Sequence, residues 1–173
     1  MKAQVRHHFL DYAAYVLMIL CFPLNPLVFL NLIKPYEIRP FLFIGAFFWL
    51  VGMILVIYPI IYFKRKGSVP TGNAYVHTTR MVTDGLYSIV RHVQYTGGIL
   101  SIFFATPFLY PHWIFILLGI PGVWLTCMSA SREDKYLIKK FGDEYKEYMA
   151  RVPSMNILKG IYRKIRNHDR QPQ

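Results

Sequence analysis

The chain has 173 residues, of which 54% are hydrophobic, 17% aromatic and 17% charged, and its formal net charge is +11. This composition excludes an ordinary water-soluble domain, and the length fits one domain over residues 1–173. A basic charge can indicate nucleic-acid binding. On a membrane protein, however, topology and anionic lipid explain it, so we expect no nucleic-acid partner.

Three windows without Asp, Glu, Lys or Arg predict the membrane-spanning helices. The windows 12–33 and 40–63 have 22 and 24 residues, which is enough for one span each. The third window, 93–131, has 39 residues, enough for two spans divided by a turn at "YPHW". The sequence therefore predicts an all-α integral membrane protein with four transmembrane helices in two helical hairpins, at about residues 12–33, 40–63, 93–110 and 113–131.

The distribution of basic residues predicts the orientation of these spans. Four spans place both termini and the middle loop on one side, and that side holds 18 of the 20 Lys and Arg residues. Lys and Arg are enriched in cytoplasmic loops. We therefore expect a multi-pass protein whose termini, loop 64–92 and C-terminal segment 132–173 are cytoplasmic.

The C-terminal segment predicts two further helical elements. Apolar and aromatic residues recur with helical spacing at Tyr136, Leu137, Phe141, Tyr145, Tyr148 and Met149. Ser131 and Asp134 have the spacing of a capping box, which would start this helix, and Pro153 would end it. Beyond it, Ile157, Ile161 and Ile165 form a stripe among basic residues, which predicts an amphipathic helix lying on the membrane surface.

Two pairs of ionisable residues flank the predicted hairpin at 93–131. Arg91 and His92 precede it, and Glu133 and Asp134 follow it. Because the two spans of a hairpin are antiparallel, we expect both pairs to meet at one membrane depth. An interfacial ion pair between Arg91 and Glu133 is one explanation. Ionisable groups at the edge of a helical bundle also indicate a functional site, which is the other.

Two stretches around these pairs are similar to a known signature. "GLYSIVRHVQYTG" resembles the pattern G-x-Y-x-x-x-R-H-P-x-Y-x-G, and "EDKYLIKKFGDEYKEYMARVP" resembles E-E-x-x-L-x-x-x-F-G-x-x-Y-x-x-Y-x-x-x-V-P. Together they resemble the isoprenylcysteine carboxyl methyltransferase and phospholipid methyltransferase superfamily of integral membrane enzymes, over roughly residues 80–153. Val93 replaces the proline of the pattern, and Asp134 replaces its second glutamate.

The resemblance implies an enzyme that uses S-adenosylmethionine to methylate a lipid or lipidated acceptor, either an isoprenylcysteine carboxylate or a phospholipid amine. It implies cofactor binding by Tyr87, His92, Tyr95, Gly97, Gly98 and Glu133, and catalytic roles for Arg91, His92 and Asp134. The loop 64–92 and the C-terminal segment would cover the cofactor from the cytoplasm. Chemically, a Glu133 carboxylate suits the amino group or ribose hydroxyls of the cofactor, and the Arg-His pair suits its carboxylate. Asp134 or His92 could deprotonate an amine acceptor.

Two other functions stay open. Sterol reductases share a related C-terminal architecture, so a membrane reductase using a nicotinamide cofactor is one. A non-catalytic, lipid-binding membrane scaffold of the same fold is the other, kept open by Val93 and Asp134. No metal site is expected, because the sequence has no CxxC or HExxH motif and His77 and His112 are predicted on opposite sides of the membrane. The acceptor and the oligomeric state are left undecided.

Overall fold

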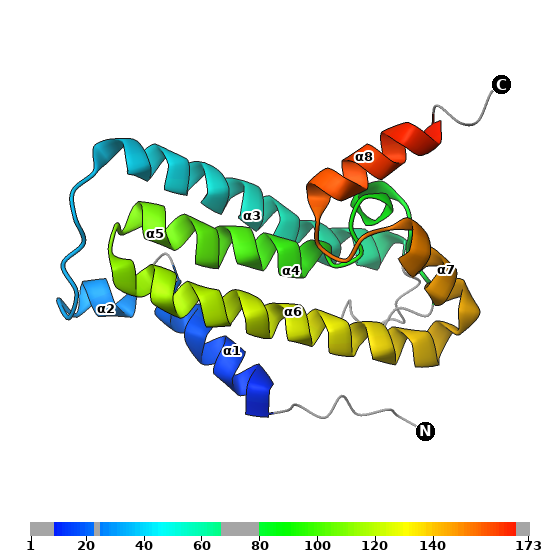
Figure 1. The fold of residues 1–173 in the computed structure, drawn as a ribbon, viewed down its shortest axis with the longest axis horizontal. Helices are drawn as coiled ribbons and strands as arrows, with labels where there is room; N and C mark the ends of the chain where they lie inside the picture. Colours follow the sequence, from blue (N-terminus) through cyan, green and yellow to red (C-terminus); the bar gives the residue numbers. More distant parts are fainter. Residues whose placement is uncertain (1–8, 23–24, 67–79, 169–173) are drawn as a thin grey trace. The chain divides into compact units, whose positions relative to one another are not determined.

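The structure is a computed structural model that describes residues 9–22, 25–66 and 80–168 (Figure 1). Its elements in chain order are α1 (Phe9–Leu20), α2 (Pro26–Phe29), α3 (Arg39–Lys66), η1 (Gly85–Ser88), α4 (Val93–Gly98), η2 (Ile99–Phe104), α5 (Ala105–Leu109), α6 (Trp113–Phe141), α7 (Asp143–Arg151) and α8 (Ile157–His168). The described residues contain helices and no strand, so the all-α prediction is confirmed.

The chain divides into two compact units. Unit 1 comprises Met1–Met53 and Gly98–Ser129, and unit 2 comprises Ile54–Gly97 and Ala130–Gln173. The helices α3 and α6 each contribute their first part to unit 1 and their last part to unit 2.

Two of the four predicted spans have the length and hydropathy of a membrane-crossing helix. They are Arg39–Phe63, within α3, and Trp113–Phe141, which is α6. The apolar helix Val93–Leu109, made of α4, η2 and α5, is shorter, and α1 has 12 residues. By length and composition, the described residues therefore contain two candidate spans.

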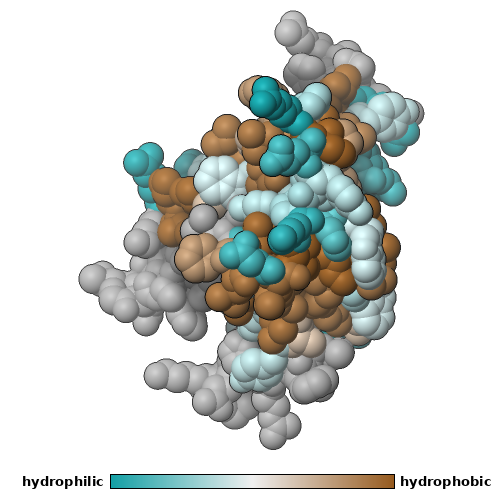
Figure 2. All heavy atoms as spheres, turned by 90° about the vertical axis from the view of Figure 1, so that its left-hand side faces the viewer, coloured by the Kyte–Doolittle hydropathy of each residue, from teal (hydrophilic) through white to brown (hydrophobic). Residues whose placement is uncertain are grey.

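The first part of α3 exposes apolar side chains to its surroundings. The large exposed ones are Phe41, Leu42, Phe43, Ile44, Phe47 and Leu50. In unit 1, α6 adds Trp113, Ile116, Leu117, Ile120 and Trp124. Figure 2 shows apolar side chains covering much of the face in view. A soluble monomer rarely exposes so much apolar surface, whereas a membrane protein presents it to lipid.

The first charge-free window forms two helices where one span was expected. Here α1 ends at Leu20, and α2 begins at Pro26, whose missing N–H is harmless at the first helical position. Asn25 is buried between them and serves both ends: its Nδ2 donates to the Leu20 carbonyl at 2.6 Å, and its Oδ1 accepts from the Leu27 N–H at 3.0 Å. This side chain replaces the helical hydrogen bonds that the break removes.

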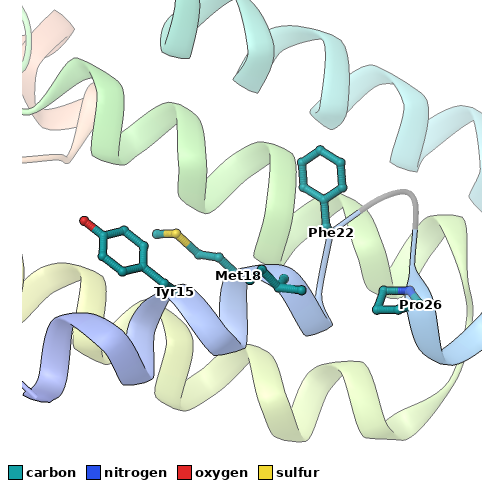
Figure 3. A pocket seen from close by; sticks show the side chains of 5 residues that line it. Tyr15, Met18, Phe22 and Pro26 are labelled. Carbon is teal, nitrogen blue, oxygen red and sulfur yellow. The ribbon is translucent and has the colours of Figure 1, made fainter.

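The break between α1 and α2 borders an apolar cavity. It has a volume of about 560 Å³ and is lined by Tyr15, Met18, Ile19, Phe22 and Pro26 (Figure 3). The Thr106 hydroxyl donates to the Cys21 carbonyl, which fixes the end of α1 within unit 1. Neither Cys21 nor Cys127 forms a disulfide in the described residues, in line with an apolar packing role.

The predicted turn at 110–113 is confirmed, because α5 ends at Leu109 and α6 begins at Trp113. The Tyr36 N–H donates to the Pro111 carbonyl at 2.8 Å, which joins this turn to the connection that precedes α3. Along the hairpin, a Cβ at Gly122 would overlap the Phe103 ring. A glycine therefore lets η2 and α6 approach closely.

Unit 2 gathers η1, α7 and α8 around the last parts of α3 and α6 (Figure 1). Its core is formed by Tyr145, Tyr148 and Val152, with Met81, Leu137, Ile138, Phe141 and Met149 packed against them. Five of the six residues of the predicted apolar pattern therefore face this core, whereas Tyr136 is exposed. The remainder of the predicted loop, residues 67–79, lies outside the described residues, as does His77.

The structure corrects the predicted helix start at Ser131. The helix α6 runs without interruption from Trp113 to Phe141, so Ser131 lies inside it and is not an N-cap. The break comes at Gly142, whose φ of +66° is readily adopted only by glycine. The following helix, α7, ends at Arg151, as Pro153 predicted. Charged residues begin at 132 while the backbone remains helical, so a change in composition was mistaken for a helix boundary.

Candidate functional site

The two halves of the sequence signature are joined by backbone hydrogen bonds in unit 2. Residues 89–92 connect η1 to α4. The Arg91 N–H donates to the Pro153 carbonyl, and the His92 N–H donates to the Ser154 carbonyl, both at 3.0 Å. The segment that follows α7 is therefore held directly against the Arg-His pair.

Asp134 joins the Arg-His pair to α6. Its Oδ2 lies 2.9 Å from Nη2 of Arg91, and its Oδ1 lies 2.9 Å from Nε2 of His92. The Tyr145 hydroxyl, from α7, donates to the same Oδ1 at 2.5 Å. The side chains of Arg91, His92 and Asp134 are 8%, 4% and 11% exposed. Three donors therefore occupy both oxygens of one buried carboxylate, and we call these four residues the Asp134 cluster.

Arg91 extends this cluster to the end of α7. Its Nη1 donates to the Val152 carbonyl at 2.6 Å and to the Met149 carbonyl at 3.1 Å. The Nε of the same guanidinium is buried and has no hydrogen-bonding partner among the described residues. Burying a guanidinium N–H without a hydrogen bond costs free energy. A ligand that carries a hydrogen-bond acceptor would remove this cost, so the unpartnered Nε–H suits a binding site.

The two tyrosines of α7 act as hydrogen-bond donors. Burial raises the pKa of Tyr145, and the hydrogen bond to the anionic Asp134 raises it further. Burial likewise raises the pKa of Tyr148, whose hydroxyl donates to the Tyr87 carbonyl at 2.6 Å. Both phenols therefore stay protonated at neutral pH and tie α7 to α6 and η1.

Glu133 lies beside the Asp134 cluster and is not part of it. Its side chain is half-buried, and among the described residues it has no hydrogen bond or ion pair. The ion pair between Arg91 and Glu133, which was one of two explanations for these residues, is not formed: the partner of Arg91 is Asp134. Neighbouring residues on a helix point about 100° apart, so one acid turns into the core while the other is left available.

The remaining predicted site residues lie in different surroundings. The Tyr95 ring meets the His92 ring edge to face, with centroids 5.6 Å apart. The Tyr87 ring is buried and stacks on the Phe63 ring, with centroids 4.9 Å apart. This contact shows that Tyr87 packs in the interior of unit 2. Gly97 is buried in α4.

Gly98 is the last residue of α4 and belongs to unit 1. A Cβ there would meet nothing within 4 Å, so packing does not explain this glycine. Unit 2 thus brings together Arg91, His92 and Asp134, with the Tyr95 ring against His92 and with Glu133 next to Asp134 in the chain.

A metal-binding site is not found in the part of the chain that the structure describes. No group of three or more His, Cys, Asp or Glu side chains is close enough there to hold an ion. His7 and His8 lie outside the described residues. The side chains of the Asp134 cluster bind one another.

Comparison with known proteins decides the family. A family model described as phospholipid methyltransferase matches residues 41–144, more than half of the chain. The chain belongs to the phospholipid methyltransferase family. Protein-S-isoprenylcysteine O-methyltransferase of Schizosaccharomyces pombe is a relative, 29% identical over 102 residues, which cover 54% of this chain and 43% of the relative. The chain therefore aligns with less than half the length of that family relative. No solved structure matches the chain.

Proposed function

We propose that this family member is a membrane-embedded, S-adenosylmethionine-dependent methyltransferase acting on a lipid or lipidated acceptor. Membership of the family supports the reaction class, and the name of the yeast relative supports a lipidated acceptor. The structural observation that carries the proposal is the half-buried Glu133 carboxylate, free of described partners, next to the locked Asp134 cluster.

The unpaired groups of this region fit the cofactor. S-adenosylmethionine carries an amino group, a carboxylate and ribose hydroxyls that a protein must bind and orient. Glu133 would accept hydrogen bonds from the amino group or the hydroxyls, and the unpartnered Nε–H of Arg91 would donate to the carboxylate. Tyr95 would supply an aromatic wall, and Gly97 and Gly98 would leave room beside α4. When bound, the cofactor supplies the methyl group on its sulfonium.

Asp134 is best assigned a positioning role. Its oxygens already accept from three donors, so it fixes the guanidinium and the imidazole in place. Because Nε2 of His92 pairs with this carboxylate, Nε2 carries the proton, and Nδ1 is the basic nitrogen of the neutral ring. If the acceptor is an amine, Nδ1 of His92 is the group that would take its proton. A carboxylate acceptor is already a nucleophile and needs no base.

Methyl transfer from a sulfonium is an in-line displacement. Holding the donor and the acceptor in line and excluding water can supply much of the rate without a covalent enzyme intermediate. The buried hydrogen bonds of Arg91 and His92 give a rigid edge for such alignment. An acceptor with a lipid tail would reach this edge from the bilayer.

The proposed topology keeps four membrane crossings. The helices α3 and α6 have sufficient length, and the other two crossings would be made by the chain over α1 and α2 together and by the helix Val93–Leu109. With 18 of the 20 Lys and Arg residues on one side, both termini and the loop 64–92 are proposed to be cytoplasmic. The Asp134 cluster, whose residues flank the apolar windows, would then face the cytoplasmic interface.

A methyl-transfer assay tests this function. The purified protein would be incubated with S-adenosylmethionine labelled on its methyl group and with either a lipid extract and a prenylated cysteine, or their water-soluble analogues. The proposal predicts label in the lipid-soluble acceptors only, lost in His92→Ala and kept in Glu147→Gln, a variant of an exposed residue on α7. Transfer to no acceptor by the folded protein, or equal transfer to the water-soluble analogues, would contradict it.

A further inference from the structure

The helix α8 presents an apolar face to its surroundings. Leu158, Ile161, Tyr162 and Ile165 follow the spacing i, i+3, i+4 and i+7, which places them on one side of the helix. They are 81%, 41%, 62% and 58% exposed. Four neighbouring apolar side chains on a 12-residue helix are thus left uncovered, and we call them the α8 stripe.

The opposite side of α8 packs on unit 2 through its backbone and polar atoms. Gly160 is buried, and a Cβ there would overlap the Ile89 carbonyl. Nζ of Lys164 donates to the Ser88 hydroxyl at 2.9 Å, and Nη1 of Arg163 lies 3.4 Å from the Ala150 carbonyl. A helix on a water-soluble protein turns its apolar side inward, so α8 is oriented the other way round.

Contacts within unit 2 connect α8 to the place where the apolar part of α3 ends. In that part Ile54, Ile57 and Ile61 are exposed, as expected next to lipid. The charged end of α3 follows, and Nζ of Lys66 pairs with Asp84 at 3.6 Å, directly before η1. The helix α8 packs on Ser88 and Ile89 at the end of η1 (Figure 1), so these contacts connect it to the charged end of α3.

The charges of α8 complement an anionic surface. The helix has no acidic residue, and exposed Lys159 and Arg166 lie at the edge of the stripe. The Arg166 guanidinium is 5.7 Å from the centroid of the Tyr162 ring. Long basic side chains can extend from an apolar face toward phosphate groups, and each basic residue near an anionic bilayer adds about 1 kcal/mol of attraction.

We propose that α8 lies in the headgroup layer of the bilayer that holds α3, with its stripe in the acyl chains and its basic side chains on anionic headgroups. The proposal is independent of methyl transfer, since it requires only that α3 be embedded. It has a structural consequence for the Asp134 cluster. The segment between α7 and α8 supplies the Pro153 and Ser154 carbonyls that hold Arg91 and His92, so membrane contact by α8 anchors this segment from its far end.

Spin labelling in nanodiscs tests the position of α8. A single label would be placed at Ile165, in the stripe, or at the exposed Lys159, in a background with Cys21 and Cys127 replaced by Ala. In discs containing anionic lipid, the label at 165 is expected to be several-fold more accessible to oxygen than to a water-soluble nickel reagent. The label at 159 is expected to show the reverse.

Equal nickel accessibility of the labels at 159 and 165 would overturn the proposal. Spin–spin broadening at 165 would also overturn it, because it would reveal a second copy over the stripe. So would a label at 165 that lies at the same membrane depth in purely neutral discs as in anionic ones. Hydrogen exchange on the unsubstituted chain provides a second readout that needs no label. The amides of residues 161–166 should exchange more slowly in anionic than in neutral discs, and equal rates would contradict the electrostatic part of the proposal.

Discussion

The imidazole of His92 and the carboxylate of Asp134 are 42 positions apart in the sequence and 2.9 Å apart in the structure, in a buried hydrogen bond. This contact joins the two halves of the signature into one framework. It also separates two adjacent acids: Asp134 holds the framework, and Glu133, which has no partner among the described residues, is the acid that we propose binds the cofactor.

Replacing Asp134 with Asn should destabilise the protein strongly. The change leaves the buried Arg91 guanidinium without its counter-charge, which costs about 3–5 kcal/mol. Asp134→Glu keeps the charge and restores the residue of the family pattern, so it should lower the melting temperature much less. Thermal unfolding in detergent would measure both. Equal melting temperatures for Asp134→Asn and the unsubstituted protein would show that the cluster does not hold the fold together.

Tyr145→Phe should weaken the framework by a smaller amount. It removes one hydrogen bond to the Asp134 carboxylate, worth about 1.5–3 kcal/mol when the acceptor is charged. The Tyr136→Phe change on the exposed side of α6 is the matched control and should have no measurable effect. Chemical denaturation monitored by tryptophan fluorescence would compare them, and similar midpoints for the two variants would contradict the role given to Tyr145.

Replacing two glycines of unit 1 with alanine should have different effects on the melting temperature. At Gly122 the new methyl group would overlap the Phe103 ring, so Gly122→Ala should lower the melting temperature. Gly98→Ala meets open space in a helical backbone and should leave it unchanged or raise it. If Gly98 keeps room for the cofactor, the same variant should bind S-adenosylmethionine more weakly. Full binding by Gly98→Ala would remove this residue from the proposed site.

Val93→Pro should be tolerated although Val93 is fully buried. The family proline falls at the first residue of α4, where proline has no N–H to lose to the helix and its fixed φ suits the start. We expect a change in unfolding free energy of less than about 1 kcal/mol. Thr96→Pro is the control, because the Thr96 N–H donates to the His92 carbonyl at 3.0 Å and its loss costs about 3 kcal/mol. Equal damage from both changes in a thermal melt would show that α4 does not begin at Val93.

The sequence was sufficient for the helical class, the turn before Trp113 and the meeting of the Arg-His pair with an acid. Charge-free windows and their lengths carry that information, because lipid excludes charge. The sequence did not show which of the two acids, Glu133 or Asp134, pairs with Arg91 and His92. Which of two adjacent acids turns into the core depends on the rotation of α6, which long-range packing sets.

Tyr145 was recognised only as part of an apolar face. Its bond to Asp134 needs the break between α6 and α7 at Gly142, whose positive φ is not encoded in helical periodicity. Pro23 and Pro26 indicate an interruption of the first charge-free window, but the sequence does not reveal that the Asn25 side chain replaces the helical hydrogen bonds lost there.

The most direct measurement is calorimetric titration of S-adenosylmethionine into the detergent-purified protein, with Glu133→Gln and Glu147→Gln beside it. We predict binding by the unsubstituted chain and by Glu147→Gln, and at least tenfold weaker binding by Glu133→Gln, about 1.4 kcal/mol. All three should melt at the same temperature. Absence of binding in the folded protein, with a nicotinamide cofactor bound instead, would contradict the account. So would a Glu133→Gln variant that binds S-adenosylmethionine as well as its control.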